Sequence, residues 1–422
     1  MSDPAFAKLK RLKINKYRSI KPGTELRFAD GINVLLGKNG SGKTTLLNLL
    51  AMVVSGNFYP IRREEFSLEF DLAYANHSAT WSVRIWNKSE RKPIHASRRD
   101  EGPAYKLDVE HHGEDSFHVT VQDSADELKR RHTNPFTHRF RQSTHGPFNE
   151  DNVSALNDLE TVPISPPLQF LKLPARVTRL DEARDWLNEL LVPNEFVTTL
   201  GIPEIDINGN DGELYLTYPL REVPDDFHEE IQQEIRRGHD QPFITINLDS
   251  VASIRTIVES LGYASGSAIF ERMSSNSPFP TYGPPRFHFT KNDGTMVRLE
   301  DLSFGEQRLF AYYYYLACSP QMLIADELSN GMHHEMVRGC IEAIGPRQAF
   351  LATQNPLLLD YLAFASLDAV RESFVLCSRE PGADREWMTM RQMSDDEGRE
   401  FFGHYQAERS HVNEILRSLG LW

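Results

Sequence analysis

Cysteine is scarce in this sequence, and long apolar runs are missing. Three cysteines occur among 422 residues, at Cys318, Cys340 and Cys377, and no two of them have the spacing of metal ligands. Thiols so rare and scattered indicate buried, reduced side chains rather than a metal site. No stretch approaches eighteen consecutive apolar residues, and the amino terminus lacks the apolar core of a signal peptide. These absences argue against export and against a membrane span, so we expect a cytoplasmic protein.

Basic residues are also in deficit. The formal net charge is −14, from 46 lysines and arginines against 60 aspartates and glutamates. Such a chain does not coat nucleic acid by bulk charge, so a nucleic-acid contact needs a local basic surface or a partner. No internal repeat or sustained heptad pattern occurs, which excludes a long coiled-coil arm. The remaining composition is that of an ordinary soluble protein, long enough for a large domain with an insertion or for two to three modules.

A glycine-rich stretch follows the first apolar run. Residues 32–36 (INVLL) predict a buried strand, GKNGSGKT at 37–44 fits GxxxxGK[ST] without a mismatch, and residues 45–52 predict a helix. In this context backbone N–H groups and a helix N-terminus surround a phosphate. Lys43 would reach the β- and γ-phosphates, and the Thr44 hydroxyl would bind Mg²⁺. We therefore predict an ATP and Mg²⁺ site formed by Gly37, Asn39, Gly40, Ser41, Gly42, Lys43, Thr44 and Thr45.

A second apolar strand far along the chain ends in two carboxylates. Residues 322–327 read MLIADE. A phosphate loop needs an acidic residue at the end of a neighbouring strand to hold Mg²⁺, and Asp326 has that position. Glu327 follows directly and would take a proton from the attacking water as general base. The alternative is a buried strand that ends in a surface acidic pair, and the phosphate loop makes this alternative weaker.

The segment LSFGEQR, residues 302–308, lies about twenty residues before this acidic strand. It resembles the signature motif of ABC-type ATPases, LSGGQ or LSxGE. In that family the motif faces the γ-phosphate held by a second subunit, which assigns Ser303 and Gly305 to a site in trans. The alternative is an N-capped helix in which Ser303 and Glu306 form a capping box, and the two interpretations are compatible.

The strand predicted at residues 348–353 continues into Gln354, Asn355 and Pro356. It resembles the switch strand of the same family, with Gln354 in the place of the usual histidine. An amide can hydrogen-bond to the γ-phosphate or to the lytic water, but it cannot become positively charged. Glutamine in place of histidine is therefore expected to affect the rate of ATP hydrolysis rather than ATP binding. The family's Q-loop glutamine has two candidates here, Gln122 and Gln142, and the sequence does not choose between them.

The amino-terminal residues 12–20 (LKINKYRSI), followed by apolar residues at 26–34, resemble the opening of the SMC/RecF/OLD-like branch of ABC-type ATPases, of the AbiEii, anti-phage type. The resemblance covers about residues 9–53 and 286–380. It implies an α/β ATPase head of the P-loop NTPase fold with a mixed β lobe. Because 283 residues separate Lys43 from Asp326, a large, partly helical insertion is expected. We predict head segments at 1–122 and 286–422 and a mostly helical lobe at 123–285.

Between the two head segments the pattern changes several times. Residues 66–86 and 105–121 alternate polar and apolar side chains, as antiparallel strands do. Within the insertion we expect helices near 180–200, 225–237 and 249–262, a hairpin at 204–218, and loops at 160–168 and 274–285. The most basic segment, 129–141, includes Lys129, Arg139 and Arg141 beside aromatic residues. It is either a solvated loop or subunit contact, or a nucleic-acid surface.

The tail predicts a closing hairpin, at 373–378 and 386–391, and a helix from about 395 to 418. Asp395, Asp396 and Glu397 are metal ligands or the acidic first turn of that helix, and we favour the helix. Relatives of the OLD type carry a TOPRIM nuclease domain after the ATPase. About thirty residues follow the hairpin, which is fewer than such a domain needs. The chain is therefore expected to be an ATPase without its own effector.

The resemblance implies a Mg²⁺-dependent ATPase that hydrolyses ATP slowly in a head-to-tail homodimer or higher homo-oligomer. Stand-alone relatives often occur in anti-phage systems, where they gate a separate nuclease or toxin, and this is the role we expect, with no membrane partner. Two alternatives stay open. One is a RecF-like, ATP-dependent DNA-binding repair factor that uses residues 129–141. The other is a nuclease site within the insertion.

Overall fold

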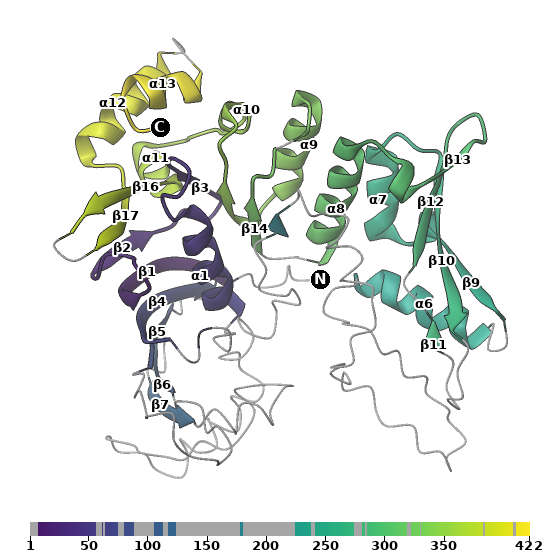
Figure 1. Cartoon of the computed structure of the whole chain (residues 1–422), viewed down its shortest axis with the longest axis horizontal. Helices are drawn as coiled ribbons and strands as arrows, with labels where there is room; N and C mark the ends of the chain where they lie inside the picture. Colours follow the sequence, from purple (N-terminus) through teal and green to yellow (C-terminus); the bar gives the residue numbers. More distant parts are fainter. Residues whose placement is uncertain are drawn as a thin grey trace.

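Within the residues that it describes, the computed structural model has three β-sheets connected by helices (Figure 1). It describes residues 7–55, 61, 64–74, 80–87, 105–112, 117–123, 178–179, 224–237, 241–273, 281–282, 285–318, 322–329, 331–382, 385–407 and 411–422. Several predicted features lie outside these residues, and they stay predictions: the basic segment 129–141, the helix near 180–200, the hairpin at 204–218, the loop at 160–168 and Gln142.

The central sheet has the strand order β17-β16-β3-β15-β14-β8, and β16, β3, β15, β14 and β8 run parallel. Parallel strands covered on both faces consist of continuous apolar residues, which matches the sequences of β3, β14 and β15. The strands are β3 (Ile32–Leu36), β8 (Thr178–Arg179), β14 (Met322–Asp326), β15 (Gln348–Ala352), β16 (Phe374–Pro381) and the antiparallel β17 (Glu386–Gln392). The helices around it are α1 (Lys43–Ser55), α8 (Phe304–Cys318), α9 (His334–Ile344), α10 (Pro356–Leu359) and α11 (Leu367–Ser373).

The first lobe is an antiparallel sheet with the order β2-β1-β4-β5-β6-β7, which lies at the left of Figure 1. Its strands are β1 (Ala7–Tyr17), β2 (Thr24–Arg27), β4 (Phe66–Tyr74), β5 (Thr80–Asn87), β6 (Tyr105–His112) and β7 (Phe117–Asp123). The strands predicted at 66–86 and 105–121 are confirmed. Leu46 and Leu50 of α1 share one buried cluster with Leu12 of β1 and Phe70 of β4. This core fixes α1, and with it the glycine-rich loop, against the first lobe.

A third, antiparallel sheet lies at the opposite end of the molecule (Figure 1). It contains β9 (Phe243–Asn247), β10 (Ser265–Met273), β11 (Thr281–Tyr282), β12 (Arg286–Thr290) and β13 (Met296–Arg298), with α6 (Asp225–Arg237), η4 (Leu248–Ser250), α7 (Ala252–Ser260) and η5 (Leu299–Asp301). The helices predicted at 225–237 and 249–262 are confirmed. The rings of Phe287 on β12 and Phe310 on α8 lie 5.0 Å apart, so this sheet supports α8.

Strand pairing in the third sheet crosses the predicted boundary at residue 285. β10, from the predicted insertion, pairs with β12, from the predicted second head segment. The strands at 243–247 and 265–273 were not predicted. The signal was present, because Ile244 and Ile246 alternate with exposed residues in β9. The described end of the insertion is therefore a mixed α/β lobe that shares a sheet with β12 and β13, the strands that precede the signature segment.

The tail forms the predicted hairpin, β16 and β17, but not one continuous helix. The prediction of a single helix over 395–418 is wrong, because α12 (Asp395–Gln406) ends at the C-cap Ala407 and α13 (Val412–Ser418) starts from the N-cap His411. Ser394 and Glu397 form a capping box, which places Asp395, Asp396 and Glu397 in the first helical turn as expected. Among the described residues, no helix is both long and apolar enough to cross a membrane.

Two of the three thiols are free and buried, Cys340 on α9 and Cys377 on β16. Burial raises the pKa of the Cys377 thiol to about 12 and raises that of Cys340 above its ordinary value. Both thiols are therefore protonated and unreactive at neutral pH, which fits the structural role predicted for them.

Candidate nucleotide-binding site

The glycine-rich loop lies between the end of β3 at Leu36 and the start of α1 at Lys43. Gly37, Gly40 and Gly42 have φ angles of +150°, +77° and +100°, a region that residues with a Cβ rarely adopt. A Cβ on Gly37 would also lie 2.2 Å from the carbonyl oxygen of Cys377, on the neighbouring strand β16. The loop conformation therefore requires glycine at these positions.

The reactive side chains of the loop point into the fold. The Lys43 ammonium is buried and donates to the carbonyl oxygens of Gly37, at 2.7 Å, and Lys38, at 3.2 Å. The Thr44 hydroxyl donates to the Asp326 carboxylate at 2.6 Å. Thr44 and Asp326, which were predicted from separate motifs and lie 282 positions apart in the chain, are thus in direct contact. Thr45 is half-buried in the first turn of α1, whereas Asn39 is exposed in the loop.

The side chains of this loop fit a nucleoside triphosphate and its magnesium ion. The Ser41 hydroxyl is buried and has no hydrogen-bond partner within the described part of the chain, which leaves a polar group in the loop to be satisfied. Lys43, which now donates to its own loop, carries the charge that a β- or γ-phosphate needs. Thr44 and Asp326 form the hydroxyl and carboxylate pair that Mg²⁺ prefers.

Glu327 and Gln354, predicted from separate motifs, are in contact. Gln354 Nε2 donates to Glu327 Oε1 at 2.7 Å. Glu327 has φ +54°, an uncommon conformation for a residue other than glycine, and its backbone N–H donates to Ala352 O at 2.8 Å. The Gln354 amide therefore orients the half-buried carboxylate of Glu327, the residue that follows Asp326 in the chain. A carboxylate so placed can accept a proton from a water molecule.

The signature segment forms the start of α8. Ser303 N donates to Glu306 Oε2 at 2.9 Å and Glu306 N donates to Ser303 Oγ at 3.3 Å, so the predicted capping box is present. Partial burial acts to raise the pKa of the Glu306 carboxyl, but hydrogen bonds from Ser303 and Tyr263 hold it below its ordinary value. The cap is therefore ionised at neutral pH. Gly305 is close-packed, since a Cβ there would lie 3.0 Å from Gly331 O.

The tip of this helix is at the surface of its own protomer. Ser303 is exposed, and 54% of the Phe304 surface is accessible. In Figure 1, α8 and α1 lie on either side of β14. No hydrogen bond joins residues 302–307 to the loop 37–45 among the described parts of either segment. The structure thus brings the loop, Asp326, Glu327 and Gln354 together and leaves Ser303 and Gly305 apart.

Four consecutive tyrosines of α8, residues 312–315, pack in or against the core. Tyr312 and Tyr314 are fully buried, and the Tyr312 hydroxyl donates to Cys340 O at 2.6 Å. Burial raises the pKa of Tyr312 well above its ordinary value, so the hydroxyl stays protonated. Gln122, one of the two Q-loop candidates, lies on β7, where it pairs with Lys106. Its assignment stays a prediction.

Sequence reasoning missed two groups of residues around the loop. From the closing hairpin, Arg379 Nε donates to Gly40 O at 2.5 Å, and a Cβ on Gly42 would lie 2.7 Å from Met388 Sδ. No motif marks these contacts, because they join opposite ends of the chain. The second group is Arg308 alone. It follows LSFGEQ directly, so its position was a signal, and it is completely buried.

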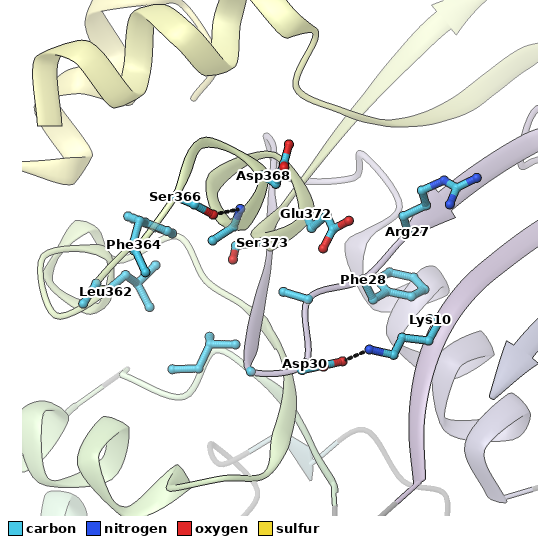
Figure 2. Close-up of a pocket in the computed structure, with 16 residues that line it drawn as sticks. Lys10, Arg27, Phe28, Asp30, Leu362, Phe364, Ser366, Asp368, Glu372 and Ser373 are labelled. Carbon is cyan, nitrogen blue, oxygen red and sulfur yellow. Dashed lines mark hydrogen bonds and ion pairs between the residues drawn. The ribbon is translucent and has the colours of Figure 1, made fainter. Parts of the chain in front are cut away.

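A separate cavity of about 580 Å³ lies at the other end of β3 (Figure 2). Its walls come from the segments 27–32 and 362–373 and from Lys10, which is paired with Asp30. Asp368 and Glu372 of α11 lie along one wall and Arg27 along another. Because β3 begins at this cavity and ends at the glycine-rich loop, the cavity is distinct from the nucleotide site.

Comparison with known proteins agrees with this geometry. A family model described as "AAA domain, putative AbiEii toxin, Type IV TA system" matches residues 32–360. The match contains the glycine-rich loop, the signature segment, the acidic strand and Gln354. None of the curated proteins matches the sequence.

Solved structures with a similar arrangement include three heads of SMC proteins. A head bound to the C-terminal winged-helix domain of ScpA is 14% identical, with 92% of this chain and 98% of that chain covered and a TM-score of 0.39. The head from Thermotoga maritima is 10% identical, with 92% and 99% covered and a TM-score of 0.37. A head from Pyrococcus furiosus, with an extended coiled coil and bound to the C-terminal domain of ScpA, is 14% identical, with 95% and 100% covered and a TM-score of 0.37.

Proposed function

Because the chain belongs to the AAA-domain family whose description names the AbiEii toxin of type IV toxin–antitoxin systems, we propose that it binds and hydrolyses ATP between two head-to-tail copies of itself. One observation carries the proposal. Lys43, Thr44, Asp326, Glu327 and Gln354 converge at one edge of the central sheet, while the signature tip that should complete such a site is exposed elsewhere.

Each residue at this edge has a distinct role in the proposed reaction. The loop amides and Lys43 hold the phosphates, and Thr44 and Asp326 hold Mg²⁺, which supplies charge neutralisation at the transferring phosphoryl group. Glu327 accepts a proton from the attacking water, and Gln354 orients the Glu327 carboxylate. Ser303 and the N-terminus of α8 from a second copy supply partial positive charge opposite the loop. Product release then allows the two copies to separate.

ATP-driven closure of the dimer is proposed to gate a separate effector, a nuclease or a toxin, in anti-phage defence. Support for this role comes from the family description, which names a toxin–antitoxin system. Matched baits test it in cells. A Glu327→Gln bait should hold the closed state and a Lys43→Ala bait the open state, so a gated partner should be enriched with one of them. Equal recovery of every co-purifying protein with both baits would count against gating.

The trapped state is also the simplest test of the reaction. Removing the carboxylate of Glu327 should lower the hydrolysis rate about 100-fold or more while ATP stays bound. The Glu327→Gln protein should therefore elute as a dimer with ATP and Mg²⁺ and as a smaller species without them, measured by light scattering. If this variant hydrolyses ATP at the wild-type rate, Glu327 is not the base.

A mixing experiment tests whether the site is shared between two copies. Lys43→Ala disables the loop and Ser303→Arg blocks the signature tip, so each variant alone should be inactive. In a mixed dimer, one site is doubly damaged and the other combines the intact loop of the Ser303→Arg copy with the intact tip of the Lys43→Ala copy. An equal mixture should recover roughly a quarter of wild-type activity, since half of the dimers are mixed and each has one intact site.

The matched control replaces the Ser303→Arg protein with a Lys43→Ala, Ser303→Arg double variant. No dimer in that mixture has an intact loop, so activity should not recover. If the original mixture also stays inactive although mixed dimers are detected, the composite site is wrong. Ser303 suits this test because its side chain is exposed, so the substitution removes the helix cap, at a cost of about 1 kcal/mol, but leaves the protomer core unchanged.

A further inference from the structure

Arg308 is the largest fully buried side chain in the described part of the protein. It lies on α8, just over one turn after Ser303. A buried guanidinium needs hydrogen-bond partners, because its desolvation is costly. Arg308 Nη2 donates to Glu327 O at 2.7 Å and to Leu328 O at 3.4 Å. The buried guanidinium of Arg308 on α8 therefore holds the backbone carbonyls that follow Asp326.

The group that Arg308 holds is conformationally strained. Glu327 has φ +54°, which costs a residue with a side chain about 1 kcal/mol or more, so the surroundings must enforce it. Contacts to three parts of Glu327 do so. Its N–H donates to Ala352 O, its carboxylate accepts from Gln354, and its carbonyl accepts from Arg308. Of these, Arg308 provides the contact that comes from α8.

Phe304 connects Arg308 to the exposed tip of the helix. The Arg308 guanidinium lies 5.4 Å from the centre of the Phe304 ring. The same ring packs on Gly331, where a Cβ would lie 2.6 Å from two ring atoms, and Gly331 has φ +72°. Phe304 follows Ser303 directly and more than half of its surface is exposed. A second copy that contacts Ser303 must therefore also reach the ring that covers Arg308.

From these contacts we propose that Arg308 is a positioning residue that couples the signature tip of each protomer to Glu327 of the same protomer. The coupling rests on the proposed function, in which Ser303 serves the partner's nucleotide and Glu327 serves the protomer's own. Engagement of the tip at one site would then adjust the base at the other site, while the hydrogen bond from Arg308 holds Glu327 in place even in a copy whose tip is not engaged. Two composite sites in one dimer would be linked through Phe304 and Arg308.

The mixed dimer gives a direct test, because its single intact site uses the tip of one copy and Glu327 of the other. Arg308→Lys retains the charge but loses the planar fork and much of the ring contact. If Arg308 positions Glu327, the substitution should lower kcat about tenfold when it is placed in the Ser303→Arg copy, which supplies Glu327. It should have no effect in the Lys43→Ala copy, which supplies only the tip. KM for ATP should stay the same in both cases.

The reverse pattern would overturn the proposal. A loss confined to the Lys43→Ala copy would mean that Arg308 only shapes the helix tip, and equal losses in both copies would mean general damage to the fold. Wild-type kcat in both placements would mean that Arg308 has no role in turnover. Arg338→Lys is the matched control, because it changes an exposed arginine of α9 whose side chain pairs with Glu342. It should leave kcat unchanged in either copy.

A second variant keeps the test independent of the stability of the core. Phe304→Ala removes a ring that is more than half exposed, so the protomer should remain folded. It should lower kcat about threefold in the same copy in which Arg308→Lys acts. Hydrogen exchange at the Glu327 amide gives a readout that needs no hydrolysis, and Arg308→Lys should speed that exchange while Arg338→Lys should not. Unchanged exchange would contradict the proposal.

Failure of the proposal and failure of the proposed function give different results. If the wild-type protein does not hydrolyse ATP and its mixtures never recover, the function itself is wrong and the coupling falls with it. If the wild-type protein and the mixed dimer are active while Arg308→Lys is neutral in both copies, the function stands and the coupling alone is wrong.

Discussion

The two halves of the proposed site differ in how completely a single protomer builds them. In the glycine-rich half, Lys43 and Thr44 have partners within their own chain, and the closing hairpin covers the loop through Arg379 and Met388. In the signature half, Ser303 and Phe304 are exposed, although the helix behind them is buried and capped. The side chains of the glycine-rich half find their partners when one protomer folds, whereas the tip of the signature half stays exposed at the protomer surface.

This difference separates binding from turnover. On the proposed function, a half that is formed within one protomer would bind nucleotide on its own, so affinity for ATP should not require a second copy. On the same proposal, the exposed tip would contribute only when two copies meet, so hydrolysis should depend on protein concentration. Had residues 302–307 been packed inside their own protomer, a shared site would have been excluded.

The largest expected contrast is in ATP affinity. Lys43→Ala removes the buried ammonium that we propose to contact the phosphates and should weaken ATP binding about 100-fold or more, because that charge contact would be lost. Ser303→Arg should leave the affinity of the monomer within about twofold, because Ser303 is remote from that protomer's own loop. Calorimetry at concentrations below dimerisation measures both. If both substitutions weakened ATP binding equally, the glycine-rich half would not bind ATP independently of the signature half.

Gln354 should produce a smaller effect, confined to turnover. Its amide donates to Glu327 at 2.7 Å. Gln354→Ala should lower kcat about tenfold and leave KM for ATP unchanged, because the carboxylate loses its orientation while the loop stays intact. Steady-state kinetics above the dimerisation concentration provide the measurement, with the exposed Gln406→Ala on α12 as the matched control. A rise in KM with normal kcat would place Gln354 in the binding half instead.

The smallest effect is expected in the tail, which belongs to neither half. Hydrogen bonds from Arg391, together with those from Ser394, lower the pKa of Glu397 to about 2 from an ordinary value of 4.5. The ionised carboxylate therefore stabilises the folded state above pH 4.5, and this contribution is lost as the pH falls towards 2. Glu397→Gln should cost about 1 kcal/mol at pH 7, a modest value because Arg391 is largely exposed to solvent, and the cost should vanish near pH 2.

Denaturant unfolding of the Glu397→Gln protein at several pH values measures this difference. Asp396→Asn, in the same helical turn but with an almost fully exposed side chain, is the control and should change stability less. ATP affinity and kcat should be unaffected by either substitution. A change in turnover would show that the tail is coupled to one of the halves.

Much of the site followed from the sequence because its chemistry is local. A phosphate loop needs glycines, a lysine and a hydroxyl at consecutive positions between a strand and a helix, so residues 37–45 determine it without reference to the rest of the chain. The same holds for Asp326 and Glu327 at the end of an apolar strand, and for the Ser303–Glu306 cap, which spans one helical turn. The buried strands at 32–36, 322–326 and 348–352 were predictable for the same reason, since strands buried on both faces are nearly continuous apolar runs.

The tertiary structure alone decided which of these local pieces touch. No spacing rule brings Gln354 to Glu327, places Arg379 on Gly40 O, or points Arg308 at the Glu327 carbonyl, because each contact depends on how strands and helices from distant segments pack. Packing also extended one sheet across residue 285 and left the signature tip exposed, since both depend on which surfaces neighbouring elements cover. Sequence thus determined the chemical groups, and the fold determined which of them one protomer brings together and which it leaves exposed at its surface.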